Sequence, residues 1–298
     1  MDTLSDLPPT SHAGWSLWPA PAKLNLCLRI VGRREDGYHL LQTVFQLLDW
    51  GDTVALRLRG DGRILRARGA AGVAPADDLA LRAAAALRAV AGGDVPGVDI
   101  DIDKRIPQGG GFGGGSSDAA TVLVALNRLW GLDLSEDALA DLGLALGADV
   151  PVFVRGRSAF AEGVGERLTP LDLPPRSYLL VDSGINVPTA ELFRAPDLTR
   201  DCPAMTISGS ISGSMGENVF EPVLRARSPA IAAMLDRLAQ VGEARVTGTG
   251  GGLFVAFDHP DAAQAARQAL PGGWRTWVAR GVNESPLRQR LAQGAPPG

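Results

Sequence analysis

A run of glycines at residues 109–115 is the part of the sequence best suited to chemistry. Six of its seven residues are glycine, and Ser116 and Ser117 follow directly. An apolar segment with helical spacing begins at Ala119, so the run precedes the N-terminal end of a helix. Free backbone N–H groups at such an end bind phosphate, because the helix dipole favours negative charge there. The run therefore predicts a phosphate-binding loop, with a flexible connector as the alternative.

Two well-known nucleotide-binding loops do not fit this run. Gly109, Gly111 and Gly114 have the G-x-G-x-x-G spacing of a dinucleotide-binding turn. However, residues 104–107 separate the run from the preceding strand, and the region about 20 residues further on is helical, which leaves no strand for a ribose-binding acid. A Walker A loop is excluded because no lysine follows the last glycine. What remains is a third kind of cradle, in which backbone amides and serine hydroxyls hold a nucleotide.

The segment Pro107–Ala120 resembles the ATP-binding motif of the GHMP kinase superfamily, which includes galactokinases, homoserine kinases and mevalonate kinases. The segment Thr247–Gly252 resembles a further motif of the same superfamily. Two other blocks, Pro21–Leu26 with Arg34–His39 and Leu146–Phe153, resemble the branch that phosphorylates 4-diphosphocytidyl-2-C-methyl-D-erythritol. The matching blocks extend over nearly the whole chain.

Two positions depart from the pattern of that branch. Phe112 stands where leucine or methionine is usual, and Gly251 and Gly252 stand where alanine and cysteine are common. Both positions lie in loops whose backbone atoms contact phosphate in the family. We expect the departures to affect the stiffness of these loops and not the chemistry.

The resemblance implies ATP-dependent transfer of a phosphoryl group to the 2-hydroxyl of 4-diphosphocytidyl-2-C-methyl-D-erythritol. The products are the 2-phosphate and ADP, and the step belongs to non-mevalonate isoprenoid precursor biosynthesis. Mg²⁺ is expected with ATP, and the sequence does not indicate which side chains contact the ion. The alternatives are another GHMP kinase, for a substrate without cytosine such as homoserine or mevalonate, and a nucleotide-binding regulator without catalysis.

The resemblance makes Asp149 and Lys23 the catalytic residues. The family counterpart of Asp149 accepts or orients the proton of the substrate hydroxyl, and the counterpart of Lys23 lies beside it. A cation there keeps the carboxylate ionised and offsets charge on the transferring phosphoryl group. By itself, Asp149 would be typical of a solvated turn, and Lys23 of a strand end that faces water. Their positions inside the matching blocks favour catalysis.

The resemblance also assigns the residues that contact the two substrates. Those expected at ATP are Pro107, Gly109, Gly110, Gly111, Phe112, Gly113, Gly114, Gly115, Ser116 and Ser117, with Gly248, Thr249 and Gly250 of a second loop near the phosphates. Those expected at the cytidine diphosphate-linked substrate are Asn25, Tyr38, His39, Phe45, Thr189 and Phe193. Within that group, Tyr38 and Phe193 would stack on the cytosine ring while His39 hydrogen-bonds its edge.

Hydrophobic periodicity predicts the elements that must position these residues. Alternating apolar residues indicate strands at 24–30, 54–58 and 98–102, and apolar residues at helical spacing indicate helices at 77–90 and 119–130. Strands and helices are mixed without a regular βαβ repeat, which favours an α+β fold.

The chain is further expected to divide into two domains. The resemblance implies a GHMP kinase fold, with a flexible tail at 1–20, a ribosomal S5-like, ATP-binding N-terminal domain at 21–172 and a ferredoxin-like C-terminal domain at 173–298. The active site would lie in the cleft between the two domains. Residues 148–151 are predicted as a turn that presents Asp149, and the uncharged segment 203–216 as a mobile loop.

Composition limits the class of protein. The 298 residues carry 29 basic and 33 acidic side chains, a net charge of −4, which argues against a nucleic-acid partner. The two cysteines, Cys27 and Cys202, are too few for a disulfide framework or a zinc cluster. The chain begins without a signal peptide and has no run of about 18 apolar residues, so we expect a cytoplasmic protein with no membrane partner. The sequence leaves the oligomeric state open.

Overall fold

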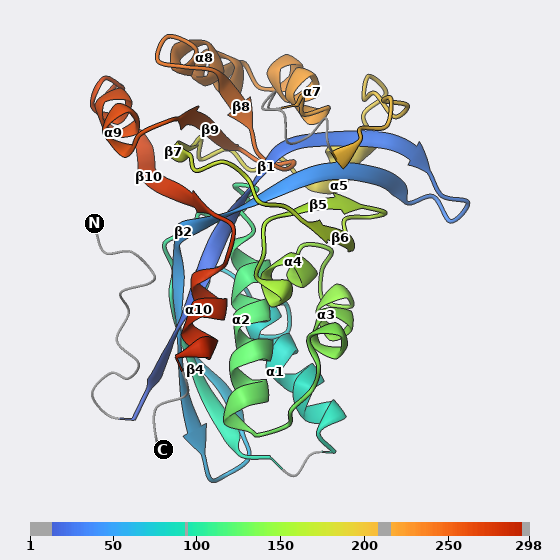
Figure 1. Cartoon of the computed structure of the whole chain (residues 1–298), viewed down its shortest axis with the longest axis vertical. Helices are drawn as coiled ribbons and strands as arrows, with labels where there is room; N and C mark the ends of the chain where they lie inside the picture. Colours follow the sequence, from blue (N-terminus) through green and yellow to red (C-terminus); the bar gives the residue numbers. More distant parts are fainter. Residues whose placement is uncertain (1–13, 93–94, 208–215, 294–298) are drawn as a thin grey trace.

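The computed structural model describes residues 14–92, 95–207 and 216–293, and Figure 1 shows its mixed helices and strands, which confirm the predicted α+β class. Within these ranges, ten strands form one sheet with the path β3-β4-β2-β10-β7-β9-β8, to which β1, β5 and β6 are attached through β2. The strands are β1 (Ser16–Arg33), β2 (His39–Arg59), β3 (Ile64–Arg68), β4 (Gly97–Asp103), β5 (Ala159–Glu162), β6 (Arg167–Pro170), β7 (Ser177–Asp182), β8 (Ala244–Val246), β9 (Gly252–Phe257) and β10 (Arg275–Val282). The helices are α1 (Leu79–Val90), α2 (Gly114–Leu129), α3 (Glu136–Leu144), α4 (Val150–Arg155), α5 (Thr189–Phe193), α7 (Phe220–Arg227), α8 (Pro229–Leu238), α9 (Pro260–Gln268) and α10 (Pro286–Ala292).

The first described strand begins earlier than the sequence indicates. Most of the predicted tail at 1–20, and the centre of the predicted loop at 203–216, lie outside the described residues. Ser16 nevertheless already belongs to β1, so the predicted end of the tail at residue 20 is wrong. The physical reason is Trp18, which is 1% exposed in the core and whose indole N–H donates to Ser16 Oγ at 2.9 Å.

Strands β1 and β2 pair antiparallel over most of their 18 and 21 residues. They are much longer than the half-buried strands predicted at 24–30 and 54–58, and most of their residues are buried. Their register sets Lys23 opposite Leu47 and Asn25 opposite Phe45, and it shifts between Asn25 and Leu28. Lys23 and Asn25 therefore point to the same side of β1, just before an irregularity that redirects the strand.

The chain crosses more than once between the two largest hydrophobic cores of the molecule. One core lies between α1 and α2 and the strands β1, β2 and β4; the other lies between α7 and α8 and the strands β7 to β9. Leu28 and Ile30 of β1 belong to the second core, while Leu287 of α10 belongs to the first. Strand β10 also pairs with β7 and then, at Gly281 and Val282, with β2. The predicted division at residue 172 misses these exchanges, because local composition does not reveal which distant strand a segment joins.

Two short stretches of backbone position the glycine run and Asp149. Gly113, with φ of 80°, is the N-cap of α2, and every residue of α2 from Ser117 to Leu126 is buried. Asp149 immediately precedes α4, so the predicted turn at 148–151 continues into a helix that the sequence analysis missed. Pro151 lies in the first turn of α4, where the missing N–H of proline costs no intrahelical hydrogen bond.

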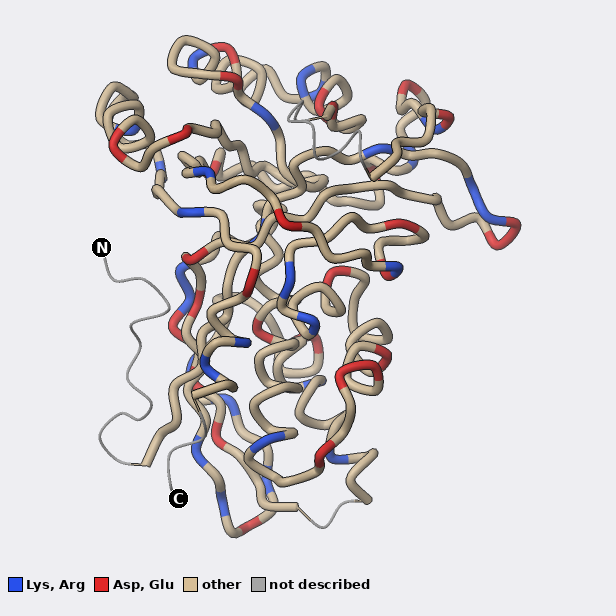
Figure 2. The backbone as a smooth tube through the Cα atoms, in the orientation of Figure 1, with Lys and Arg blue, Asp and Glu red and all other residues tan. Residues whose placement is uncertain are grey.

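Basic and acidic residues are interspersed along the backbone, as Figure 2 shows. On the sheet, Asp99 of β4 pairs with Arg57 and Arg59 of β2, and Asp101 pairs with Arg68 of β3. Paired charges of this kind are typical of a solvated sheet face. No helix in the described part of the chain has the length and apolar character needed to cross a membrane.

Candidate active site

Two cavities meet at the centre of the molecule. The larger, of about 960 Å³, is lined by β1, β2, α5 and the segment that precedes α4. The smaller, of about 470 Å³, lies along the glycine run, which we call the glycine loop (residues 109–115). The side chains or backbones that line both cavities are Gly111, Ser116, Asp149, Thr189 and Thr249. Two ligands that filled these cavities would therefore meet beside Asp149.

Most of the predicted site residues line one of these cavities. The larger is lined by the predicted residues Lys23, Asn25, Tyr38, His39, Phe45, Thr189, Phe193 and Gly248. The smaller is lined by Pro107, Gly109, Gly110, Gly113, Gly114, Gly115 and Gly250. The topology thus gathers residues from β1, β2, α2, α5 and two loops around one space.

Lys23 and Asp149 form an ion pair at the junction of the cavities. The Nζ atom of Lys23 lies 3.1 Å from Asp149 Oδ2, and the exposed fractions of the two side chains are 3% and 35%. The carboxylate of Asp149 makes no capping hydrogen bond to α4, so it remains directed at Lys23 and the cavities. The lysine is thus enclosed by protein, while the carboxylate is open to a ligand.

A chain of hydrogen bonds fixes the lysine. Lys23 Nζ donates to Asn25 Oδ1 at 2.5 Å, and Asn25 Nδ2 donates to Thr43 Oγ1 at 2.8 Å. The Thr43 hydroxyl in turn donates to the carbonyl of Cys27 at 2.5 Å. Lys23 Nζ also lies 5.3 Å from the ring centroid of Phe45, within range of a cation–π interaction. Thr43 is a member of this network that the sequence analysis missed.

The glycine loop packs against the second predicted loop, at 248–250, backbone to backbone. A Cβ added at Gly111 would overlap the carbonyl of Thr247, and one added at Gly250 would overlap the carbonyl of Gly109. Asn218 steadies the second loop, because its side-chain amide donates to the carbonyls of Val246 and Gly248 at 3.1 and 2.9 Å. The two glycine clusters therefore form one packed unit, and glycine is required at these positions because a side chain would overlap the backbone of the other loop.

Phe112 and Ser117 are exceptions among the predicted ATP contacts. Both side chains are completely buried and line neither cavity, so we correct their role from ATP contacts to supports of the loop. The Ser117 hydroxyl donates to the carbonyl of Pro21 at 2.6 Å. Phe112 packs in a core beneath the loop, and a Cβ on Gly252 would lie 2.8 Å from its ring. The two departures from the family pattern are thus in contact: position 112 has a large side chain, and position 252 has no side chain and leaves room for it.

A buried charge cluster under the glycine loop was not found by sequence reasoning. Lys104 Nζ contacts carboxylate oxygens of both Asp52 and Asp118, and Asp52 Oδ1 also accepts the backbone N–H of Ile106 at 2.8 Å. Burial, reinforced by repulsion from Asp52, raises the pKa of Asp118 to about 8 against the opposing effect of Lys104. Burial opposes the charge of Lys104, yet the two carboxylates hold its pKa above the ordinary value. A proton on Asp118 removes one of the two carboxylate charges that surround Lys104.

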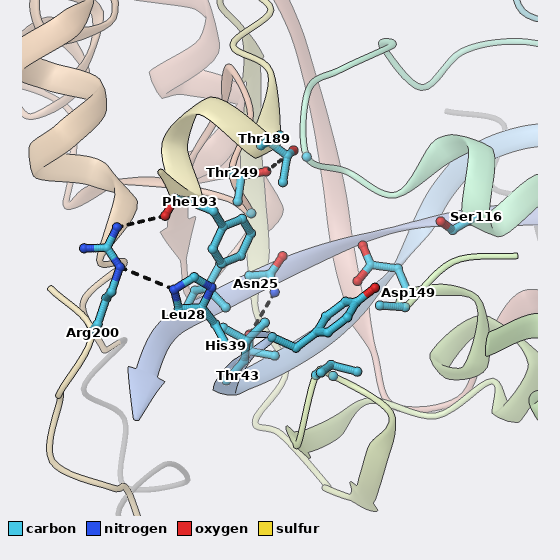
Figure 3. A pocket seen from close by; sticks show the side chains of 18 of the residues that line it. Asn25, Leu28, His39, Thr43, Ser116, Asp149, Thr189, Phe193, Arg200 and Thr249 are labelled. Atoms are coloured by element: carbon cyan, nitrogen blue, oxygen red, sulfur yellow. Dashed lines mark hydrogen bonds between the residues drawn. The ribbon is translucent and has the colours of Figure 1, made fainter. Parts of the chain in front are cut away.

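The far end of the larger cavity is aromatic. The His39 ring stacks on the Phe193 ring, with centroids 5.0 Å apart and planes inclined by 25° (Figure 3). Tyr38 is 65% exposed, and the guanidinium of Arg34 lies 6.0 Å from its ring centroid. The structure thus places His39, and not Tyr38, against Phe193. The expected stacking of cytosine between Tyr38 and Phe193 stays a prediction.

The fold, the two joined cavities and the buried lysine beside an open carboxylate define a small-molecule kinase of the GHMP class. In agreement, the family model of the GHMP kinase N-terminal domain matches residues 78–157, and that of the C-terminal domain matches residues 190–276. A solved mevalonate kinase structure shares the fold, with a TM-score of 0.67 at 15% identity over 90% of this chain and 99% of that chain.

More similar proteins narrow this class. A 4-diphosphocytidyl-2-C-methyl-D-erythritol kinase from Xanthomonas axonopodis pv. citri (strain 306) is 61% identical over 95% of this chain and 95% of its own length. One from Xylella fastidiosa (strain 9a5c) is 59% identical over 92% of each chain. A crystal structure of 4-(cytidine 5'-diphospho)-2C-methyl-D-erythritol kinase matches with a TM-score of 0.77 and 35% identity, over 90% of this chain and 98% of that chain. The chain belongs to the 4-diphosphocytidyl-2-C-methyl-D-erythritol kinase family and is an ATP-dependent kinase.

Proposed function

We propose that Lys23 and Asp149 are the catalytic pair of a kinase that phosphorylates 4-diphosphocytidyl-2-C-methyl-D-erythritol. The reaction transfers the γ-phosphoryl group of ATP to the 2-hydroxyl of this substrate and yields the 2-phosphate and ADP. It is a step of non-mevalonate isoprenoid precursor biosynthesis. ATP occupies the cavity of about 470 Å³ beside the glycine loop, and the cytidine substrate occupies the cavity of about 960 Å³.

The junction of the two cavities at Asp149 is the observation that carries this proposal. A phosphoryl group passes directly from donor to acceptor when the two oxygens are in line. Here Asp149 and Ser116 line both cavities, and Lys23 approaches Asp149 to 3.1 Å. An enclosed cation at the point where donor and acceptor meet suits such a transfer, because it offsets the charge of the moving phosphoryl group.

Each part of the site then has its own role in the reaction. Asp149 accepts a hydrogen bond from the attacking hydroxyl and orients its oxygen toward the γ-phosphorus. Lys23, fixed by Asn25, pairs with that carboxylate and offsets the charge that develops on the transferring group. Backbone N–H groups of the glycine loop and the first turn of α2 bind the ATP phosphates. Because these donors are held before ATP binds, little reorganisation is needed in the transition state.

Mg²⁺ would enter with ATP. Among the residues that the structure describes, no group of three or more His, Cys, Asp or Glu side chains could hold a metal by itself. Mg²⁺ commonly keeps waters and takes one or two protein oxygens together with substrate phosphates. The Ser116 hydroxyl and the Asp149 carboxylate fit that requirement, since both line the junction of the cavities. When bound, the ion neutralises charge on the phosphates.

Release of ADP, measured with and without the cytidine substrate, tests the proposal. We expect release only when ATP and 4-diphosphocytidyl-2-C-methyl-D-erythritol are both present. Equal or faster turnover of homoserine or mevalonate would assign the chain to a different GHMP activity. Binding of ATP without any substrate-dependent ADP release would indicate a nucleotide-binding regulator and would refute the catalytic roles of Lys23 and Asp149.

A further inference from the structure

We propose that Arg200 is a positioning residue that fixes His39 in one tautomer and thereby selects the base of the substrate. The inference rests on the proposed function, because it assumes that the base lies beside His39. It concerns a residue outside every motif that the sequence analysis singled out.

Arg200 joins the segment after α5 to the first residue of β2. Its Nη2 atom donates to the carbonyls of Phe193 and Ala195, both at 2.8 Å, and its Nη1 atom donates to the carbonyl of Leu198 at 2.9 Å. Its Nε atom donates to His39 Nε2 at 3.3 Å, as Figure 3 shows. Four hydrogen bonds from one planar group hold the guanidinium in a single orientation.

The chemistry of these two side chains decides where the proton of His39 lies. A guanidinium has N–H donors and no acceptor, so His39 Nε2 must carry a lone pair. The proton of the neutral imidazole is therefore on Nδ1. Burial, and then the charges of Arg200 and Arg33, lower the pKa of His39, so the doubly protonated ring is disfavoured. The other charged side chains that line this cavity are Asp36, Arg194, Lys23 and Asp149.

A ring held in this way offers a donor and not an acceptor. No hydrogen-bond partner for His39 Nδ1 occurs among the residues that the structure describes, so its N–H is available to a ligand. Cytosine presents a lone pair at ring atom N3, whereas uracil presents an N–H there, so a fixed Nδ1–H matches cytosine and opposes uracil. Arg200 also binds the carbonyl of Phe193, whose ring stacks on His39, and so it sets the plane of the imidazole as well as its proton. Free rotation or the other tautomer would remove the discrimination.

Kinetics with two substrates separate this role from simple support of the 193–200 segment. We would measure KM and kcat of the wild type, Arg200→Ala and Arg200→Lys with the cytidine substrate and with its uridine analogue. The lysine variant keeps the charge but cannot make the forked contacts. In both variants we expect KM for the cytidine substrate to rise about tenfold, from loss of one oriented hydrogen bond. We expect KM for the uridine analogue to stay within about threefold of its wild-type value. The ratio of KM for the uridine analogue to KM for the cytidine substrate should therefore fall about tenfold, while kcat and KM for ATP change by less than about threefold.

A parallel rise of both KM values, with an unchanged ratio, would overturn the proposal and leave Arg200 as a structural residue only. Arg227→Ala is the matched control, because Arg227 pairs with Asp197 of the same segment at 3.5 Å and has no contact with His39. This variant should leave the ratio of KM values unchanged. If the wild type turns over neither nucleotide substrate, the proposed function fails and base selection fails with it, while the spectroscopic test still decides whether Arg200 fixes the tautomer of His39.

Nitrogen NMR reads the tautomer directly and needs no substrate. The chain has 3 histidines, and His39→Gln identifies the signals of His39. We expect a protonated Nδ1 and an unprotonated Nε2 in the wild type, and a mixture of the two tautomers in Arg200→Ala. A wild-type His39 protonated at Nε2, or a tautomer that does not change in Arg200→Ala, would refute the inference.

Discussion

Replacement of Asp149 by asparagine isolates the charge at the junction of the two cavities. The amide has nearly the same shape as the carboxylate, so α4 and the cavities should keep their form. What changes is the partner of Lys23, whose Nζ atom now lies 3.1 Å from Asp149 Oδ2. The substitution also removes the group that accepts a hydrogen bond from the substrate hydroxyl.

The structure sets the size of the two effects. Loss of a positioned acid–base group lowers kcat by about 10²–10⁴-fold, which corresponds to about 2.7–5.4 kcal/mol. The effect on folding should be much smaller. Breaking a fully buried ion pair costs about 3–5 kcal/mol, but Asp149 is 35% exposed and the amide oxygen still accepts a hydrogen bond from Lys23. We therefore expect the free energy of unfolding to fall by only about 1 kcal/mol.

Steady-state ADP release and urea unfolding, measured on the same preparations, test these values. KM for ATP should rise much less than kcat falls: the variant loses one of the two oxygens proposed for Mg²⁺, but the backbone donors of the glycine loop still bind the phosphates. Lys23→Met should also lose most of kcat, and the double variant should be no slower than the slower single variant, because the two side chains act as one unit. Asp141→Asn, an exposed carboxylate on α3, is the matched control and should be silent. A kcat for Asp149→Asn within about threefold of the wild type would refute the assignment.

Three further predictions concern the loop, the buried cluster and the aromatic end. Gly113→Ala should lower the free energy of unfolding by about 1–3 kcal/mol in urea and raise KM for ATP more than KM for the cytidine substrate, because its Cβ would lie 2.7 Å from Phe153 Cζ. Gly131→Ala, at a similar φ of 62° but with nothing within 4 Å, separates backbone strain from this overlap, and equal effects of the two variants would contradict our reasoning. The pKa of Asp118 is raised to about 8, so the folded protein keeps this proton up to about pH 8, whereas the unfolded chain releases it near pH 4. The free energy of unfolding should therefore fall as the pH rises from about 4 to 8, and a slope that persists in Asp118→Asn would count against this origin. Tyr38→Ala and Phe193→Ala should each raise KM for the cytidine substrate about tenfold with KM for ATP unchanged, but only Phe193→Ala should lower the melting temperature, since Phe193 also packs on Phe220 while Tyr38 is 65% exposed. Unchanged KM values in both variants would place the base elsewhere.

Much of the site could be predicted because its chemistry is local in the sequence. Gly109, Gly111 and Gly113 all have positive φ, a conformation that other residues adopt only with strain, so the glycine run records the shape of the loop directly. The start of α3 is equally local, since the Ser135 side chain accepts the backbone N–H of Ala138 at 3.2 Å. The family motifs also carried the class of reaction.

The extent of strands and the borders between packing units could not be predicted in the same way. Hydrophobic alternation found only residues 24–30 of β1 and residues 54–58 near the end of β2, because the rest of each strand is held by partners that lie elsewhere in the chain. The return of α10 to the first core, and the pairing of β10 with β2, depend on the path of the whole chain. A local pattern reports whether a segment is buried but not which distant segment buries it.

The sequence by itself thus determined the reaction class and predicted the phosphate-binding loop and the pair Lys23 and Asp149, because the family motifs and the glycine run lie in short segments of the chain. Only the tertiary structure decided that Arg200 reaches His39, 161 positions away, and that Lys104 lies between Asp52 and Asp118. It also decided that Phe112 and Ser117 support the loop from beneath. These outcomes depend on the register of β1 with β2 and on the packing of loops from both cores. The partner of a side chain is fixed there by the arrangement of the whole chain and not by its neighbours in sequence.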